Sequence, residues 1–345
     1  MAYTAVDKHT AHFNTSLYSG TGSSNAITGV GFQPDWVWFD NRSTGLAKEM
    51  YDSARGVEKK LTSSNSDAES TEVGLTAFGA DGFTCGARNQ TNKDGDGITA
   101  WSWKAGGAGS ANSDGATSST VSANATAGFS IVKWTGTGST TTIGHGLGAA
   151  PGMMFIKGYS SADSWGVYHK SPGATKYLLL AANSAAGTAS TLFNDTEPTS
   201  SVFTVGTTST TNGNGVSYIA YCFADVKGFS RIGSYTGNGA ADGTFTYTGF
   251  KPSWVLLKIY SSTDSWFIFD TATSIVGGNN PNSYYQRPNE TSAQGTSSSL
   301  SMDLYSNGFK CRNTDTALNS SGATYAYYAI GQTLVGSNNI TAKAR

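Results

Sequence analysis

The sequence predicts an all-β fold made of three tandem antiparallel β-sandwich or jelly-roll-like repeats of about 100 residues each. The first observation is a recurring pattern: Pro252 and Trp266 each lie 101 residues after Pro151 and Trp165, within segments of similar sequence. A third copy opens with YSGTG at Tyr18 and lacks the Asp-x-Trp element of the others. The second observation is a composition rich in residues of turns and strands. Self-similarity at a fixed spacing indicates one structural unit made three times.

The composition also limits the classes of partner. Charged residues make up 13% of the 345 residues, aromatic residues make up 12%, and the formal net charge is −1. A near-neutral chain has no basic stripe to neutralise phosphates, so nucleic acid is not an expected partner. No apolar run approaches the roughly 20 residues that span a bilayer, and the N-terminus lacks the apolar core of a signal peptide. We therefore expect synthesis in a host cytoplasm and no membrane partner.

The repeats define the expected segments, and each repeat is long enough to bury its own core. Gly, Ala, Ser, Asn and Thr dominate residues 106–126, which favours a flexible connection about which the first repeat is free to hinge. Only residues 225–228 join the other two repeats, so we expect these in a fixed orientation. The expected segments are an N-terminal arm (1–10), repeat 1 (11–105), a Gly/Ser-rich linker (106–126), repeat 2 (127–225), repeat 3 (226–334) and a C-terminal tail (335–345).

Strands are expected at matching places in each repeat. Residues 35–39 (DWVWF) form a mostly apolar run typical of a buried strand. Residues 47–61 have helical propensity, but their counterparts in the other repeats read as strand ends, so we expect a strand, a loop and a strand. Residues 81–85 predict a turn that enters a strand, and residues 98–103 predict a strand with tryptophans on one face.

Two motifs favour turns over ligand sites. Residues 92–97 (NKDGDG) resemble the start of a calcium loop, but the matching hairpin at 212–215 lacks carboxylates and no bidentate Glu follows at the EF-hand spacing. The Gly-x-Gly at Gly20, Gly136 and Gly237 precedes no expected helix, so a tight turn or bulge is favoured over a phosphate cradle. We expect no metal and no cofactor.

Cysteine, histidine and glutamate give no catalytic pattern. The three cysteines, Cys85, Cys222 and Cys311, are too scattered for a disulfide framework and are expected as small buried side chains. His145 and His169 share no metal-binding spacing and are expected to be structural or exposed. Glycoside hydrolysis needs two acids set about 5 to 10 Å apart, and no glutamate recurs between repeats. We therefore expect the protein not to be an enzyme.

Asp163 with Trp165, and Asp264 with Trp266, form one candidate binding element. An aromatic face can stack on a sugar while a carboxylate binds its hydroxyl groups. The alternative is that the aspartate caps a hairpin and the tryptophan enters the core, and this alternative is favoured. Both interpretations apply only to the second and third repeats, because the first repeat has no Asp-x-Trp.

Tyr284, Tyr285 and Arg287 form the most distinctive aromatic and basic cluster outside the repeated pattern. Loop positions that differ between copies are where a repeated scaffold can carry a separate specificity. The alternative is a strand edge with ordinary packing. The sequence leaves these two interpretations open.

Several segments resemble a repeat found in virion proteins of tailed phages. They include GLGAAP at 146–151, YHKS at 168–171, NDTEPTSSVF at 194–203, SYTGNG at 234–239 and the closing TAKAR at 341–345. The resemblance covers nearly the whole chain. Such proteins are abundant among marine phages and are described as tail-fibre-like or of unknown function. The resemblance implies a virion component and supplies no catalytic or binding residues.

The sequence therefore leaves three functions open. The first is a tail-fibre or surface-appendage protein of the virion that contributes to host attachment, with other virion proteins and a host surface glycan as partners and a homo-oligomer, such as a trimer, as its state. The alternative is a head decoration protein that binds and braces the capsid lattice, using an ordered arm within residues 1–16. The second alternative is a glycan-degrading enzyme of the particle, which requires paired acids in a groove.

Overall fold

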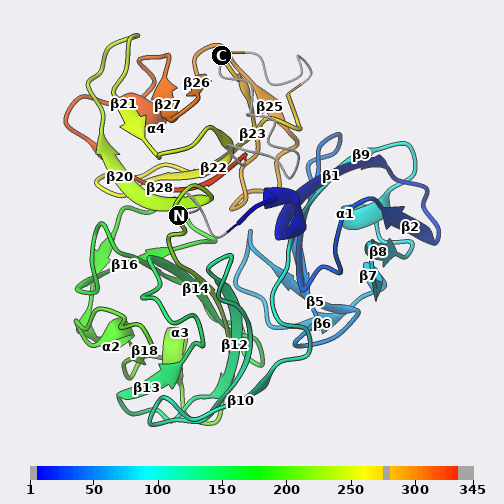
Figure 1. The fold of residues 1–345 in the computed structure, drawn as a ribbon, viewed down its shortest axis with the longest axis vertical. Helices are drawn as coiled ribbons and strands as arrows, with labels where there is room; N and C mark the ends of the chain where they lie inside the picture. The colour runs from blue at the N-terminus through cyan, green and yellow to red at the C-terminus, as the bar shows by residue number, and fades with distance from the viewer. Residues whose placement is uncertain (1–5, 275–279, 333–345) are drawn as a thin grey trace.

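The computed structural model describes residues 6–274 and 280–332, and its elements are strands, short helices and turns (Figure 1). The expected C-terminal tail, 335–345, lies outside the described residues. All pairings between named strands in the described ranges are antiparallel, for example β1 with β9 and β12 with β19. The predicted all-β, antiparallel class is confirmed.

Each of the three main sheets contains four neighbouring strands in one order, in which the last strand of a repeat lies between its first strand and its central apolar strand. This arrangement closes each repeat on itself. The strands are β1 (Phe13–Ser19), β9 (Gly97–Trp103), β3 (Trp36–Asn41) and β4 (Glu49–Asp52); β12 (Phe129–Thr135), β19 (Ser217–Phe223), β14 (Met153–Gly158) and β15 (Gly166–His169); and β20 (Ser230–Thr236), β28 (Thr324–Gly331), β22 (Pro252–Ile259) and β23 (Trp266–Asp270).

A small sheet covers the outward face of each main sheet. The apolar side chains between the two layers form a separate cluster in each repeat, such as the one that holds Phe39 and Phe83 in the first. Similar clusters fill the second and third repeats. The small sheets are β2 (Asn25–Thr28), β8 (Gly82–Cys85) and β7 (Leu75–Gly79); β13 (Thr141–Gly144) and β18 (Val202–Val205); and β21 (Phe245–Tyr247), β27 (Gly308–Cys311) and β26 (Met302–Tyr305).

The remaining elements are short. Within residues 6–274 and 280–332, four helices have four residues each and one 3-10 turn has three: α1 (Asn89–Asn92), α2 (Ser190–Phe193), α3 (Ser209–Asn212), α4 (Thr316–Asn319) and η1 (His9–Ala11). The other strands are β5 (Lys59–Thr62), β6 (Ser70–Thr71), β10 (Ser110–Asn112), β11 (Ser119–Asn124), β16 (Lys176–Leu179), β17 (Gly187–Thr188), β24 (Tyr284–Tyr285) and β25 (Gly295–Thr296). β4 and β5 give the strand, loop and strand expected over 47–61, so that prediction is confirmed.

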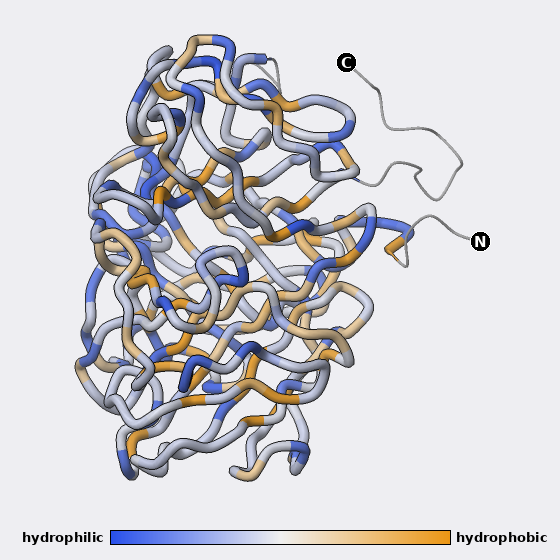
Figure 2. The backbone as a smooth tube through the Cα atoms, turned by 90° about the vertical axis from the view of Figure 1, so that its left-hand side faces the viewer, coloured by the Kyte–Doolittle hydropathy of each residue, from blue (hydrophilic) through white to orange (hydrophobic). Residues whose placement is uncertain are grey.

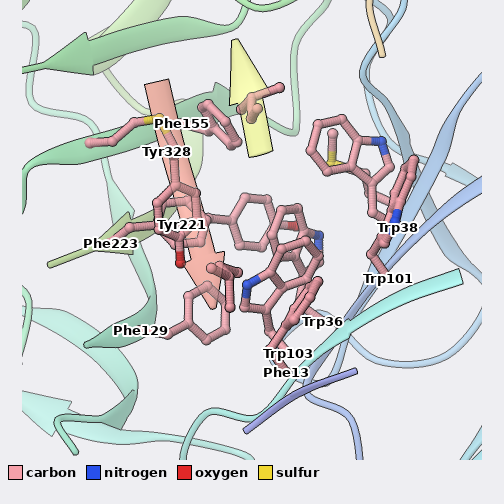
Figure 3. Close-up of a cluster of buried hydrophobic side chains, with 14 of the residues drawn as sticks. Phe13, Trp36, Trp38, Trp101, Trp103, Phe129, Phe155, Tyr221, Phe223 and Tyr328 are labelled. Carbon is pink, nitrogen blue, oxygen red and sulfur yellow. The ribbon is translucent and has the colours of Figure 1, made fainter. Parts of the chain in front are cut away.

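The inward faces of the three main sheets meet in one aromatic core (Figure 3). Trp36 stacks on Tyr221 of the second repeat at 4.4 Å between ring centroids, and Phe223 lies 4.9 Å from Tyr328 of the third. Each buried aromatic ring removes about 150–250 Å² from water, worth about 4 to 6 kcal/mol of transfer free energy. Trp101 and Trp103 both point into this core, as the alternation in β9 predicted.

The expectation that each repeat buries its own core is only half right. One face of each main sheet is covered within its repeat, but the other face carries aromatic side chains that only the neighbouring repeats can cover. The hydrophobic stretches accordingly recur through the whole height of the molecule (Figure 2). The three repeats therefore form one body around a shared centre (Figure 1).

The expectation that residues 106–126 form a flexible linker is also wrong. Its residues form β10 and β11, and β11 pairs with β12 at the edge of the main sheet of the second repeat. Strand pairing uses backbone N–H and C=O groups, so small side chains do not prevent it. Lys133 of the second repeat donates to the carbonyl of Ala54 in the first, and this bond opposes the expected hinge.

Buried side chains at the end of the fourth strand of each repeat bond to the next repeat in a closed cycle. Asp52, His169 and Asp270 share this register position, opposite Trp36, Met153 and Trp254. The cross-repeat bonds are Tyr221 Oη to Asp52 (2.8 Å), His169 Nε2 to the Tyr327 carbonyl (3.2 Å) and Trp101 Nε1 to Asp270 (2.8 Å). Burial lowers the pKa of His169 to about 4, which keeps this ring neutral.

Three buried lysines form a second cycle that runs back to the preceding repeat. Each is almost fully excluded from solvent and donates to a backbone carbonyl across the boundary, which satisfies the buried ammonium group. The bonds are Lys157 to Ser66 (3.0 Å), Lys258 to Asn183 (3.1 Å) and Lys48 to Ser292 (2.6 Å). Burial lowers the pKa of Lys258 to about 8.

The Gly-x-Gly segments are turns, each held by a buried asparagine at the end of a short helix. Asn212 accepts from the backbone N–H of Thr137 at 2.9 Å and donates to the carbonyls of Ser139 and Gly206 at 2.7 and 2.8 Å. Asn92 and Asn319 make the corresponding bonds in the other repeats. All three asparagines are 0% exposed, so they serve the fold and leave no cradle for a phosphate.

Candidate functional site

The Asp-x-Trp elements face the interior. Trp165 and Trp266 are 0% and 1% exposed, and their Nε1 atoms donate to the carbonyls of Thr62 and Leu179 across repeat boundaries. No ring face is open for a sugar to stack on. The hypothesis of a sugar site at these tryptophans is therefore not supported by the geometry.

The aspartates of these elements cap their own loops. The Oδ1 atoms of Asp163 and Asp264 each accept from the next backbone N–H at 2.7 Å. Their backbone carbonyls accept from Lys157 at 2.6 Å and from Lys258 at 2.5 Å. The alternative favoured from the sequence, a hairpin-capping aspartate and a core tryptophan, describes both elements.

Tyr284, Tyr285 and Arg287 come together, but largely to bind one another and the sheet below. The Arg287 guanidinium lies 5.2 Å from the ring of Tyr285 and 5.3 Å from that of Phe267, and it pairs with Glu290 at 3.2 Å. Tyr284 and Tyr285 are half-buried in the two-residue strand β24. This cluster behaves as an ordinary strand edge, with its cation already occupied.

The loop that resembled a calcium site is a turn. The Asp96 carboxylate accepts from Thr44 Oγ1 at 2.6 Å and Asn41 Nδ2 at 2.8 Å, and Lys93 lies 3.3 Å away. Hydrogen bonds from these groups, led by Thr44, lower the pKa of Asp96. Across residues 6–274 and 280–332, no three His, Cys, Asp or Glu side chains converge as metal ligands would.

The small sheet of the third repeat lies at the outer rim of the molecule (Figure 1), and it carries an exposed aromatic surface. We define it as Phe245 and Tyr247 of β21 with Tyr305 of β26. Phe245 is 43% exposed and Tyr247 is 63% exposed. Thr246 between them is buried, because successive side chains of a strand point to opposite faces of the sheet. The two rings therefore share the outward face.

Gly308 shapes the floor of this surface. In the register of the sheet it lies between Tyr247 and Tyr305, which it separates without adding a side chain. A Cβ atom at Gly308 would come within 2.8 Å of Phe245 Cζ, so the Phe245 ring leans over this glycine toward Tyr305. The centroids of Phe245 and Tyr305 are 5.9 Å apart. A hollow of about 310 Å³ opens beside them, lined by Phe245, Tyr305, Ser306, Asn307 and Lys310.

Four charged side chains border the aromatic surface, two of each sign. Asp242 pairs with Lys310 at 2.6 Å and with Arg312, while Asp303 lies 3.3 Å from Arg312 Nε and accepts from Tyr305 Oη at 3.0 Å. The hydrogen bond from Lys310 lowers the pKa of Asp242. Burial, with the bond to Asp303, raises the pKa of Tyr305. The border therefore carries carboxylate acceptors and cationic donors with no net charge.

The same face of the first repeat carries only small side chains. By strand register, Ala26 and Thr28 of β2 stand where Phe245 and Tyr247 stand in β21, and Gly79 of β7 stands where Tyr305 stands in β26. In the second repeat, the positions of Phe245 and Tyr247 hold Thr142 and Gly144. Of the three small sheets in the described residues, the one in the third repeat carries aromatic rings on its outward face.

Sequence reasoning missed these residues, although a signal was present. The third repeat has FTY where the first has AIT and the second has TIG. Two large aromatics flanking a small residue, in a strand whose counterparts carry only small outward residues, mark an outward-facing pair.

The family described as domain of unknown function DUF7483 matches residues 8–333. The chain belongs to this family. The DUF7483 match begins before β1 and ends after β28, so it includes the shared core and the aromatic surface. No curated protein matches the chain. Within the described residues, no helix has the length and apolar character needed to cross a bilayer.

Proposed function

We propose that this DUF7483 protein is a structural component of a phage virion, a tail-fibre or other surface-appendage protein that contributes to host attachment and carries out no catalysis. The observation that supports attachment is the aromatic surface, present on one of three small sheets of the same kind. Exposed apolar side chains that gather on one face mark interaction sites more often than scattered ones do. The resemblance of the sequence to tailed-phage virion repeats supports the location.

The architecture suits a particle exposed to the outside. The three repeats share one core and are tied by two cycles of buried bonds, so the free energy that resists local opening is distributed over the whole body. The three cysteines are free and buried, so the fold depends on no disulfide that a reducing host cytoplasm would prevent. Such a body holds a small binding face rigidly, which limits the entropy lost on binding.

Immunogold electron microscopy tests the location. Antibodies raised against the purified chain are applied to the particles produced from the genome that encodes it. We expect gold at the tail or its appendages. Gold over the head would instead support the decoration protein, and particles without gold would contradict a virion component altogether.

Competition for adsorption tests the role. Purified chain added to host cells before the particles is expected to slow adsorption, and the Tyr247→Ala chain is expected to do so less. Equal competition by both chains would separate attachment from the aromatic surface. Release of sugar from the cell envelope by the purified chain would support the degrading enzyme and contradict the non-catalytic role.

A further inference from the structure

We infer that the aromatic surface of the third repeat is a binding site for uncharged pyranose sugars. This inference deepens the proposed attachment function and rests on it for its biological setting. It names a site, Phe245, Tyr247 and Tyr305 with Asp242 and Asp303, that differs from the Asp-x-Trp elements expected from the sequence.

The rings have the geometry that sugar stacking requires. One face of a pyranose ring presents C–H groups of slight positive charge, and these pack on the negative face of an aromatic ring. Tyr247 and Tyr305 stand on either side of a glycine, with Phe245 leaning between them, so the apolar surface is continuous and open on its outer side. The adjoining hollow of about 310 Å³ is of the order that a small ligand fills.

The polar border supplies hydrogen-bonding groups for hydroxyls. Asp242 is 70% exposed and Asp303 is 13% exposed, and both retain acceptor capacity beside their cations, because a carboxylate has about four lone-pair sites. Lys310 and Arg312 add donors. A sugar hydroxyl can donate to the carboxylates and accept from Lys310 or Arg312. The border therefore suits an uncharged ligand with many hydroxyl groups.

The balance of charge selects neutral sugars over acidic ones. Lys310 and Arg312 are both paired with Asp242, and Arg312 also faces Asp303, so no net positive field remains for a uronate or other carboxylate sugar. An acidic sugar would have to displace Asp242 and would then lie close to its carboxylate. We therefore expect a preference for neutral pyranoses and little dependence of binding on salt.

The size of the surface argues against a protein partner as its main occupant. An ordinary protein–protein interface takes about 800 Å² from each partner. The three partly exposed rings offer on the order of 300 Å², given about 150–250 Å² for a whole aromatic side chain. The small residues at the matching positions of the other repeats do not extend the patch.

Affinity gel electrophoresis of the purified full chain tests the inference, since it detects weak binding to immobilised polymers. The probes are dextran, mannan and chitin oligomers as neutral pyranoses, and polygalacturonate and hyaluronate as acidic ones. At least one neutral probe is expected to retard the chain. Phe245→Ala and Tyr247→Ala are each expected to weaken that binding about three- to tenfold. The control Val73→Ala, which removes a side chain that is 54% exposed on the first repeat, is expected to leave it unchanged.

A charge switch adds a second readout. Asp242→Asn removes one negative charge from the border and releases Lys310, while Arg312 keeps Asp303 as its partner, so this variant is expected to gain retardation by polygalacturonate that high salt abolishes. Retardation of the wild-type chain by acidic probes alone, or neutral binding that survives the Phe245→Ala/Tyr247→Ala double substitution, would overturn the inference. Circular dichroism of each variant shows whether a loss of binding reflects a loss of fold.

The outcome is separable from that of the proposed function. A wild-type chain that binds host cells, loses that binding after protease treatment of the cells, and is retarded by no neutral probe would support attachment and contradict the sugar site. Binding of neutral probes that depends on Tyr247, together with particles that carry no gold, would support the sugar site and contradict the virion role.

Discussion

Replacing Tyr221 with phenylalanine removes one hydroxyl from the boundary between the first and second repeats. The hydroxyl donates to Asp52 Oδ2 at 2.8 Å, and both side chains are 0% exposed. Asp52 keeps two other donors, Arg55 Nε at 2.6 Å and the Arg55 backbone N–H at 2.8 Å. The ring itself is unchanged, so its stacking on Trp36 persists. The substitution therefore isolates one bond between repeats.

The expected loss follows from this environment. A hydrogen bond to a charged group contributes about 1.5 to 3 kcal/mol, and because the carboxylate retains two donors we expect the low end, about 2 kcal/mol. Guanidinium unfolding at pH 7, followed by tryptophan fluorescence and far-UV circular dichroism, measures the change in the free energy of unfolding. A cycle with Asp52→Ala is expected to give a coupling energy of about 1 to 2 kcal/mol.

Two results would refute this reasoning. A loss below about 0.5 kcal/mol, together with no coupling to Asp52, would mean that the hydroxyl does not join the repeats. Separate fluorescence and circular dichroism transitions in the wild-type chain would contradict a shared core, because repeats that cover one another should unfold together.

Three further predictions concern buried polar groups. Lys258→Met leaves the carbonyls of Asn183 and Asp264 without this donor, and denaturant titration should show a loss of about 2 kcal/mol at pH 7. The pKa of Lys258 is lowered from 10.5 to about 8, so between these pH values Lys258 is protonated in the unfolded chain and neutral in the folded one. The free energy of unfolding of the wild type therefore rises with pH in this range, and its difference from that of Lys258→Met should widen. Asn212→Ala leaves the buried Gly206 carbonyl unpaired and should lower the free energy of unfolding by about 3 kcal/mol in the same titration. An equal loss for Asn214→Ala, at an exposed position of the same turn, would contradict the role given to Asn212. Burial raises the pKa of Asp270 above its unfolded value near 3.8. The contribution of Asp270 to the free energy of unfolding is therefore full below pH 3.8 and declines as the pH rises through the folded pKa. Asp270→Asn should flatten that part of the stability–pH curve, and an unchanged curve would contradict the shift.

The strands could be predicted from the sequence because their signals are local. The apolar run that became β3 and the alternation that became β9 need only the period of two that places side chains on alternate faces. Residues 47–61 have helical propensity, and only their counterparts in the other repeats indicate the strands that the structure has there. The packing of repeats against one another is different, since nothing local distinguishes a tryptophan that faces its own repeat from one that faces the next.

The flexible linker was wrongly expected, and the bonds made by the two candidate tryptophans were not foreseen, for physical reasons. Residues 106–126 have side chains that bury little, yet β11 is held by backbone bonds to β12, which composition does not report. The repeated pattern singles out Trp165 and Trp266, but both donate to backbone carbonyls of a neighbouring repeat, a long-range contact that sequence spacing cannot show. The aromatic surface was detectable, but only as a difference between copies.

Differences between the repeats fall into two kinds, and the distinction supports the proposed site. In the first repeat, Asp40 stands where Lys157 and Lys258 stand in the others, and Lys48 lies opposite it where the others have tryptophan. Lys48 pairs with Asp40 and still reaches a carbonyl of the third repeat, so one change compensates for the other and the boundary is kept.

The rings of the third repeat show no such compensation. Phe245 and Tyr247 replace small residues on an outward face, remain 43% and 63% exposed, and contribute little to burial. A ring that stays about half exposed brings the fold less packing gain than a buried ring and raises the risk of unwanted association. A difference that the fold does not need is best explained by a contact outside the fold. We therefore propose a function for the aromatic surface and not for the more conspicuous tryptophans, whose bonds the fold already requires.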